Sequence, residues 1–250
     1  MILNIGKRIV EKRDRLLFLV WKYKQHLKYF FGSDSYSAIV MFHHVRNDRP
    51  RDILDSCQCT ISEFQDFCNY VGDNYSIVSI HDLLNQVAQG GRNLLVISFD
   101  DVPSNFYTNA YPILKKHNYP FILYITTDFI DLDGYLTSRQ LEILSKDPLC
   151  TIGVHTKSHP FLKLCSNLDN EVLRCKEILE QKLGLKIKDF AYPYGTPTAI
   201  NKEVISFLKN CDQYESAVTT IPGLINSNVI KNRYSLPRIH SKLFISKYKK

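Results

Sequence analysis

The chain has 250 residues, enough for one large domain or two small ones, and enough to bury a core without disulfides or a structural metal. Hydrophobic residues make up 44% of it and charged residues 23%, which excludes a disordered or collagen-like chain. The formal charge of +7 is concentrated at the ends: residues 1–31 hold eight basic and two acidic side chains, and residues 242–250 hold four lysines. Residues 32–241 hold 20 basic and 23 acidic side chains, without a basic stripe, so we predict no nucleic-acid partner.

Cysteine usage and hydropathy indicate a cellular compartment. Seven cysteines without a Cys-x-x-Cys pair predict free, mostly buried thiols in a reducing environment. The longest apolar run, residues 16–21, is far shorter than the ~20 residues of a membrane span, and it lacks the cleavage site of a signal peptide. We therefore expect a cytoplasmic protein.

Residues 7–31 predict a basic helix, because apolar positions recur near helical spacing with lysines and arginines between them. One interpretation is a terminal helix packed on the body or on a partner subunit. The other is a helix that lies on an anionic membrane surface, which would place the protein at the inner face of the membrane. Residues 32–37 break the helix, so we predict a basic helix with its linker in residues 1–36 and a catalytic domain in residues 37–250.

Short apolar runs rich in β-branched and aromatic residues recur through the rest of the chain. The predicted strands cover residues 38–42, 77–80, 94–99, 121–126, 151–154, 190–192, 217–219 and 234–239. Helical patterns begin at Ser62 and cover residues 105–117 and 170–183. Strands alternating with helices are typical of βαβ units and a parallel sheet. The number of units predicts an α/β fold with a (β/α)7-8 barrel-like sheet.

Two adjacent carboxylates, Asp100 and Asp101, follow the apolar strand predicted over residues 94–99. In a parallel barrel the carboxyl ends of the strands form the rim that carries chemistry. Neighbouring carboxylates in a desolvated place repel each other and favour a cation. Because side chains alternate along a strand, we expect one to bind a metal while the other faces a water. The alternative is a helix N-cap, where aspartate is favoured.

Two histidines, His155 and His159, follow the strand predicted over residues 151–154. Imidazoles four residues apart on a turn can converge on one ion, and neutral imidazole is a standard zinc ligand. Such a pair alone is more often structural, but the aspartate pair at another strand end of the same rim favours a shared site. One aspartate and two histidines leave a coordination position open for water, as catalytic sites do.

A third strand end, residues 190–195, reads Phe-Ala-Tyr-Pro-Tyr-Gly. Its proline and glycine fit an ordinary turn. The functional interpretation is that Tyr192, Pro193 and Tyr194 form a wall for a sugar ring. The amide of Tyr194 would then be free to donate to a developing oxyanion.

These motifs resemble those of the polysaccharide deacetylases, a carbohydrate esterase family with a NodB-like barrel domain. The family's Phe-Asp-Asp-Gly motif is similar to residues 99–102, its His-Ser/Thr-x-x-His-Pro motif matches residues 155–160, and its Pro-Tyr-Gly ending matches residues 193–195. Residues 39–45 resemble the Tyr-His-x-Val strand of the branch that includes deacetylases of poly-N-acetylglucosamine and of envelope polysaccharides. The resemblance covers about residues 37–240.

The resemblance implies a metal-dependent hydrolase that removes the acetyl group from an N-acetylated sugar or glycan. The implied cofactor is a divalent ion, first of all Zn²⁺, with the ligands Asp101, His155 and His159. Asp100 is the implied general base, and the Tyr194 amide would hold the oxyanion. His43, at the end of the first strand, is the implied general acid, with His240 as the alternative.

The sequence departs from the family pattern in three places. Ala191 occupies the position of an arginine that orients the base, and Arg238 is a candidate substitute because its planar fork suits a carboxylate. Val102 replaces a glycine and would be strained at positive φ. No Asp-Trp motif is recognised, and the single Trp21 lies in the basic helix. The alternatives to an N-deacetylase are an inactive glycan-binding or scaffolding relative and an O-acetyl esterase.

Overall fold

The structure of the protein is a computed structural model that describes residues 36–47 and 57–248. These residues belong to Ser35–Lys250, the larger of two compact units of the chain. The basic helix predicted over residues 7–31 lies outside the described residues. The strands of the described chain are β1 (Ala38–Phe42), β2 (Ser76–Ile77), β3 (Leu94–Asp100), β4 (Phe121–Ile125), β5 (Cys150–Val154), β6 (Asp189–Ala191), β7 (Ser216–Val218) and β8 (Ile239–His240). The α-helices are α2 (Ile61–Asn74), α3 (Ile80–Ala88), α4 (Tyr111–His117), α5 (Ser138–Ser145), α6 (Cys175–Leu183), α7 (Lys202–Asn210) and α8 (Ser241–Tyr248).

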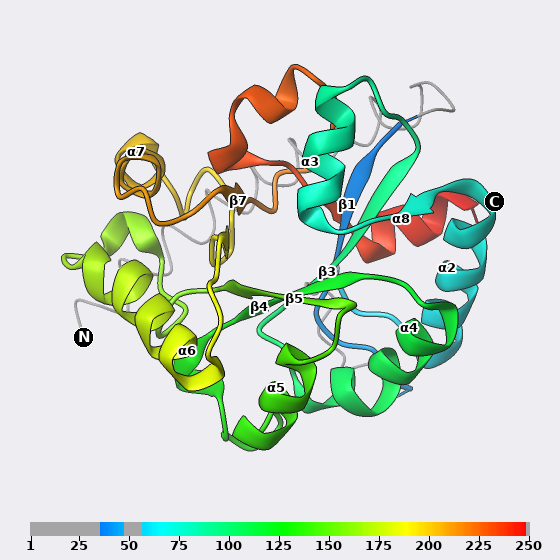
Figure 1. The fold of residues 1–250 in the computed structure, drawn as a ribbon, viewed down its shortest axis with the longest axis horizontal. Helices are drawn as coiled ribbons and strands as arrows, with labels where there is room; N and C mark the ends of the chain where they lie inside the picture. Colours follow the sequence, from blue (N-terminus) through cyan, green and yellow to red (C-terminus); the bar gives the residue numbers. More distant parts are fainter. Residues whose placement is uncertain (1–35, 48–56, 249–250) are drawn as a thin grey trace. The chain divides into compact units, whose positions relative to one another are not determined.

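All eight of these strands join one parallel sheet, ordered β7-β6-β5-β4-β3-β1-β8, with β2 paired to β3 beside this path. The sheet curls, and helices lie around its outer side (Figure 1). A parallel bridge between Val218 and Leu236 connects β7 with the segment that leads into β8. The predicted α/β barrel-like fold is therefore confirmed.

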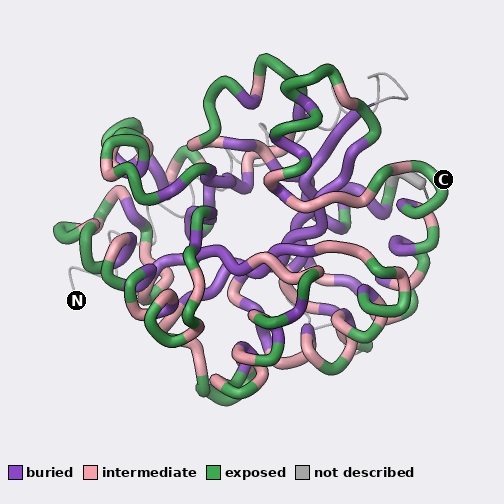
Figure 2. The backbone as a smooth tube through the Cα atoms, in the orientation of Figure 1, coloured by how far each residue is buried: buried purple, intermediate pink, exposed green. Residues whose placement is uncertain are grey.

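The outward face of the sheet packs on helices through aromatic rings. Phe42 of β1 and Phe99 of β3 stack with ring centroids 5.3 Å apart. Phe64 and Phe67 of α2 lie 5.1 and 4.9 Å from Phe42. Such pairs add about 0.5–1.5 kcal/mol beyond the burial of their area, so this cluster fastens α2 to the sheet. The strands are buried, and the outer surfaces of the helices are exposed (Figure 2).

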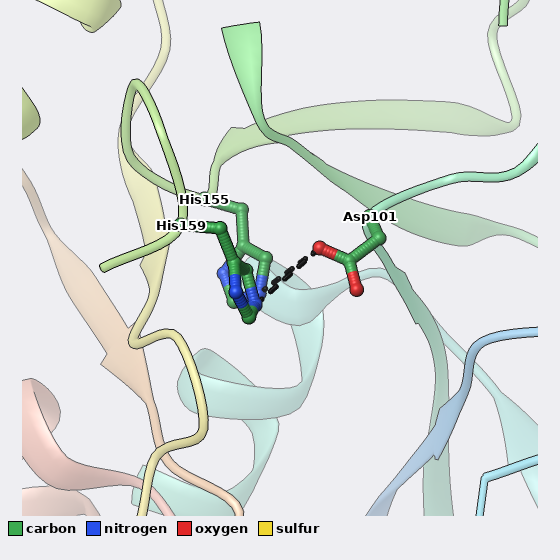
Figure 3. A group of neighbouring side chains, drawn as sticks. All are labelled: Asp101, His155 and His159. Atoms are coloured by element: carbon green, nitrogen blue, oxygen red, sulfur yellow. Dashed lines mark ion pairs between the residues drawn. The ribbon is translucent and has the colours of Figure 1, made fainter. Parts of the chain in front are cut away.

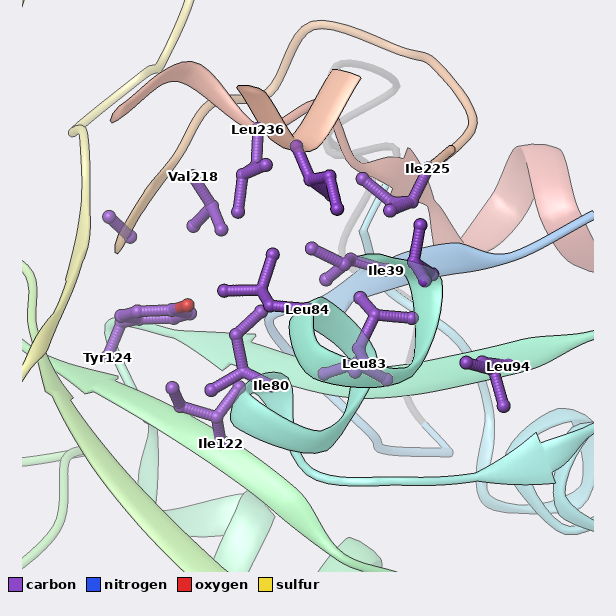
Figure 4. Packing of buried hydrophobic residues seen from close by; sticks show 14 residues of the cluster. Ile39, Ile80, Leu83, Leu84, Leu94, Ile122, Tyr124, Val218, Ile225 and Leu236 are labelled. Carbon is purple, nitrogen blue, oxygen red and sulfur yellow. The ribbon is translucent and has the colours of Figure 1, made fainter. Parts of the chain in front are cut away.

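The inward face of the sheet packs on α3, whose side chains lie among those of the strands (Figure 4). The strand residues of this cluster are Ile39, Leu94, Val96, Ile122, Tyr124, Ala191 and Val218. On α3 the buried residues are Ile80, Leu83, Leu84 and Val87, which is the spacing of one helix face. The helix starts after Ser79 because its hydroxyl caps the first turn. The strand predicted over residues 77–80 is therefore wrong beyond residue 77.

Local capping and helix type also differ from the prediction. Thr60 caps α2 by accepting from the Glu63 amide, while the Glu63 carboxylate accepts from the Thr60 amide, so the helix begins before Ser62. The stretches predicted as helices over residues 105–117 and 170–183 each begin with a π-helical segment. These segments are η1 (Phe106–Ala110) and η4 (Asp169–Arg174).

All seven cysteines lie within the described residues and are free thiols, as predicted. None of the helices in the described part of the chain combines the length and apolar character needed to cross a bilayer.

Candidate active site

Strand β3 delivers two adjacent carboxylates to the carboxyl end of the sheet. Asp100 is its last residue and is buried. The chain then turns sharply, because the Val102 amide donates to the Asp100 carbonyl over 2.6 Å and Asp101 adopts φ +58°. Val102 itself has φ +46°, so the strain expected for a β-branched residue in place of glycine is present. The turn directs the two carboxylates to different partners, as strand alternation predicts.

Arg238 reaches Asp100 from the segment before β8 and is fully buried. Its Nη1 donates to Oδ1 over 2.7 Å and its Nη2 donates to Oδ2 over 2.5 Å. Its Nε donates to the Thr219 carbonyl over 2.8 Å, and its guanidinium lies 5.5 Å from the centre of the Tyr124 ring. Arg238 thus makes the bidentate contact expected of a substitute for the family's orienting arginine.

The Asp100 carboxyl is ionised despite its burial. Burial raises its pKa, but the charge and hydrogen bonds of Arg238 outweigh that effect, and the pKa lies well below its usual range. His155 and, more weakly, His43 act in the same direction as Arg238. The bidentate contact fixes the orientation of the carboxylate as well as its charge.

Asp101, His155 and His159 converge at the rim (Figure 3). Asp101 Oδ1 lies 3.7 Å from His155 Nε2 and 3.5 Å from His159 Nε2, and the candidate ligand atoms all lie within 4.8 Å of one another. This Oδ1 is buried without a hydrogen-bond partner among the described residues. Such an oxygen is costly unless a cation meets it. Two imidazoles and one carboxylate suit Zn²⁺, so the residues present fit a divalent ion.

Each imidazole can offer an unprotonated nitrogen. His155 Nδ1 lies 2.8 Å from the Ala191 carbonyl, which can only accept, so in the neutral ring Nδ1 carries the proton and Nε2 faces the cluster. Burial and then the neighbouring His155 lower the pKa of His159 to about 4. His159 is therefore neutral near pH 7, the state in which it binds a metal.

The third strand end separates the three residues that the sequence assigns to substrate binding. Tyr192 is fully buried and donates its hydroxyl hydrogen to the Tyr234 carbonyl over 2.9 Å. Pro193 is also buried, in a turn closed by the Gly195 amide, which donates to its carbonyl over 2.6 Å. The prediction that these two side chains line a sugar site is therefore wrong, because both are enclosed in the protein.

Tyr194 is the member of this set that faces outward, with 44% of its surface exposed. Its ring lies 4.7 Å from that of His159 and stacks on Phe161 with centroids 4.1 Å apart. Its backbone has φ +59°, and its amide donates no hydrogen bond to another described residue. Tyr194 thus brings an exposed ring and an amide to the edge of the histidine and aspartate cluster.

The two candidate general acids differ in their surroundings. His43 follows β1 at the same rim and is partly exposed. His240 lies in β8, is 7% exposed, and has its Nε2 3.1 Å from the Thr220 carbonyl, so that nitrogen is engaged as a donor. The exposure of His43 makes it the better placed of the two to meet a leaving group.

Two asparagines that hold the strand end after His43 are absent from the sequence prediction. Asn105 accepts from the Val45 amide over 3.0 Å and donates to His44 Nδ1 over 2.9 Å. Asn109 donates to the Val45 carbonyl over 2.7 Å. These partners are 60 to 64 residues apart in the chain, so no local pattern identifies them.

The fold and this rim define a barrel-like parallel α/β domain with a histidine and aspartate centre at the carboxyl ends of its strands. The sequence profile of the polysaccharide deacetylases matches residues 88–215, just over half of the chain, so the protein belongs to that family. This confirms the family named from the motifs.

Relatives agree with the family assignment. YxkH of Bacillus subtilis (strain 168), named as a polysaccharide deacetylase, is 23% identical over 207 residues, covering 80% of this chain and 70% of that protein. The poly-β-1,6-N-acetyl-D-glucosamine N-deacetylase of Staphylococcus aureus (strain N315) is 28% identical over 161 residues. That match covers 57% of this chain, and the chain spans about half (52%) of the staphylococcal enzyme.

Solved structures share the fold. The Streptococcus pyogenes deacetylase PplD, in complex with acetate, matches with a TM-score of 0.72 and 21% identity over 85% of this chain and 97% of that one. IcaB from Ammonifex degensii matches with a TM-score of 0.64 and 20% identity over 86% of this chain and 98% of that one. At this level of identity the similarity establishes the NodB-like fold.

Proposed function

We propose that the protein is a divalent-metal-dependent deacetylase that hydrolyses the N-acetyl group of an amino sugar in a glycan. The observation that carries the proposal is the unpartnered Asp101 Oδ1 facing two imidazole nitrogens, next to an Asp100 carboxylate fixed by Arg238. Membership of the polysaccharide deacetylases and the name of the staphylococcal relative support this substrate class.

In this mechanism the protein's own groups move protons and hold charge. Asp100 accepts a proton from the attacking water, while Arg238 keeps its carboxylate ionised and correctly turned. The Tyr194 amide donates to the carbonyl oxygen as negative charge develops there. His43 protonates the departing amine, a positioned transfer worth about 10²–10⁴ in rate.

Asp101, His155 and His159 hold the metal. When bound, a divalent ion such as Zn²⁺ polarises the amide carbonyl and lowers the pKa of water, so that a weak base suffices. The exposed rings of Tyr194 and Phe161 give the pyranose an apolar surface beside this centre.

The test measures bound metal and acetate release from N-acetylglucosamine oligosaccharides on the same preparations. Asp100→Asn should keep its metal and lose about 10²–10⁴ in kcat, because only the proton acceptor is removed. Asp101→Asn and His159→Ala should lose metal and activity together. Asp133→Asn, an exposed carboxylate outside the cluster, is the matched control and should change neither quantity.

Normal turnover by Asp100→Asn would falsify the assigned base. Release of acetate from O-acetyl sugars alone would replace the proposed reaction with that of an esterase. His43→Gln should lower kcat far more than His240→Gln does, and the reverse order would move the role of general acid to His240.

A further inference from the structure

The loop that carries the two cluster histidines has a strained backbone. Thr156 adopts φ +68° and His159 adopts φ +58°, so two non-glycine residues occupy the left-handed region within four positions. Each such residue costs conformational free energy. The loop therefore keeps its shape only if contacts around it fix that shape.

Glu171 supplies such contacts from η4, the π-helical segment before α6. Its Oε2 accepts from the amides of Lys157 and Ser158 over 3.1 and 2.9 Å, and its Oε1 accepts from the Ser158 hydroxyl over 2.8 Å. The Lys157 amide is shared with the Glu171 main-chain carbonyl, also 3.1 Å away. Two successive backbone N–H groups thus converge on one carboxylate oxygen, the arrangement in which backbones bind anions. The donors, Lys157 and Ser158, are two of the three residues between His155 and His159.

Among the described residues the Glu171 carboxylate has no charged partner, so its contacts are the hydrogen bonds to Lys157 and Ser158. The residue is 9% exposed, and a buried carboxylate is costly unless hydrogen bonds satisfy it. The Lys157 ammonium does not pair with it, because its Nζ donates to Asp128 over 2.9 Å. Glu171 also lies outside the group of side chains that could hold a metal in the described chain. Hydrogen bonds to a charged acceptor are stronger than neutral ones, which suits a role in holding a strained loop.

We propose that Glu171 is a positioning residue that sets the geometry of His155 and His159 through the backbone of Lys157 and Ser158. This inference rests on the metal site of the proposed function and adds a residue that the mechanism does not otherwise use. The carboxylate acts as an internal anion around which the loop folds. It thereby brings both imidazoles toward Asp101 before any metal arrives.

The experiment measures the dissociation constant for Zn²⁺ by competition with a chelating dye, and the thermal midpoint of the metal-free protein. Glu171→Ala should weaken Zn²⁺ binding about 10–100-fold, the usual cost of removing a group that orients metal ligands. Glu171→Gln should recover most of the affinity. Its amide oxygen can accept from both N–H groups, and the Ser158 hydroxyl can turn to accept from its NH₂.

Glu177→Ala is the matched control, since Glu177 lies on neighbouring α6, is exposed and pairs with Arg174. It should leave the Zn²⁺ dissociation constant within about twofold of wild type. If Glu171→Ala does not fold, Ser158→Ala removes one of the three bonds and should weaken Zn²⁺ binding by a smaller factor, about two- to tenfold.

Equal Zn²⁺ affinity in wild type and Glu171→Ala, with a lowered thermal midpoint, would overturn the inference and leave Glu171 as a residue of general stability. So would an unchanged affinity in Ser158→Ala where Glu171→Ala is unfolded. A wild-type protein that binds Zn²⁺ but releases no acetate would contradict the proposed function and leave this inference standing. A wild-type protein that binds no Zn²⁺ would contradict both.

Discussion

Val102 occupies the one position of the Asp-Asp motif where this chain departs from its family. It is buried and holds φ +46°, directly after Asp101 at φ +58°. A left-handed backbone costs a residue other than glycine about 1–2 kcal/mol of conformational free energy, and a branched Cβ raises that cost. The strain lies beside the carboxylates and is held by the packing around Val102.

Replacing Val102 therefore gives a test of that strain. Val102→Ala keeps the strained left-handed backbone and loses the two buried methyl groups. Val102→Gly loses Cβ as well but relieves the backbone. We expect Val102→Gly to be more stable than Val102→Ala by about 1 kcal/mol in urea unfolding. At Val154, a buried residue of β5, the order should be the usual one, with glycine less stable than alanine. If the alanine variant is more stable than the glycine variant at both positions, the backbone at residue 102 is not strained.

The site residues divide into those that the sequence reveals and those that it does not. Asp101, His155 and His159 could be predicted because each follows an apolar strand, and parallel strands bring their carboxyl ends together. Glu171 could not, because it acts on backbone groups 13 and 14 residues away and resembles any polar residue of an amphipathic helix. Tyr192 was misassigned because the turn motif does not show which rings point inward.

At the scale of elements, α3 shows where sequence patterns are ambiguous. The apolar residues before Leu83 continue those of a strand, and the helical period becomes clear only when Val87 is included. Most sheet strands were easier to predict because they are continuous apolar runs bounded by polar turns. The strand predicted over residues 234–239 is wrong before residue 239, since Arg233–Ser235 form a 3-10 helix and β8 is Ile239–His240. Helix α7 was not predicted, although Val204, Phe207 and Leu208 follow the helical period, because nine residues cover fewer than three turns.

The contact between α3 and β6 gives the packing of this helix a dependence on pH. His81 Nε2 of α3 lies 2.9 Å from Oδ2 of Asp189, which is fully buried and also accepts from the Ser216 hydroxyl over 2.7 Å. Neither His81 Nε2 nor Asp189 Oδ2 makes a hydrogen bond of ordinary geometry, so the contact is an ion pair in a bent arrangement. The Asp189 carboxylate raises the pKa of His81 above its usual value.

A raised pKa in the folded state stabilises the protein fully below the unfolded pKa of His81, about 6.5, and this contribution is lost as the pH rises through the folded pKa. His81→Gln should therefore lower the free energy of unfolding by about 0.5–1 kcal/mol at pH 5.5 and by less at pH 9. Urea titrations at the two pH values measure the difference. His117→Gln, at a histidine without a carboxylate contact among the described ion pairs, should show no such difference. A larger loss for His81→Gln at pH 9 would contradict the assigned ion pair.

At the scale of the whole molecule, the charge of +7 lies at the two ends of the chain. Residues 32–241 have three more acidic than basic side chains, and the candidate active site lies in this part. Residues 1–31 carry six more basic than acidic side chains. If this segment binds an anionic membrane, the distribution of charge and not the net charge determines the affinity.

Two variants with the same net charge test whether binding to an anionic membrane depends on residues 1–31 or on the net charge alone. One changes four basic residues of the N-terminal segment to glutamine: Lys12, Arg15, Lys22 and Lys24. The other changes four exposed lysines of the body: Lys116, Lys202, Lys209 and Lys231. Each basic residue near an anionic surface contributes about 1 kcal/mol, so the loss of four should weaken binding of the first variant to vesicles containing phosphatidylserine about 1,000-fold. The second should bind as wild type does, in cosedimentation at low and physiological salt. Equal losses in both variants would show that net charge governs the binding and that residues 1–31 have no special part in it.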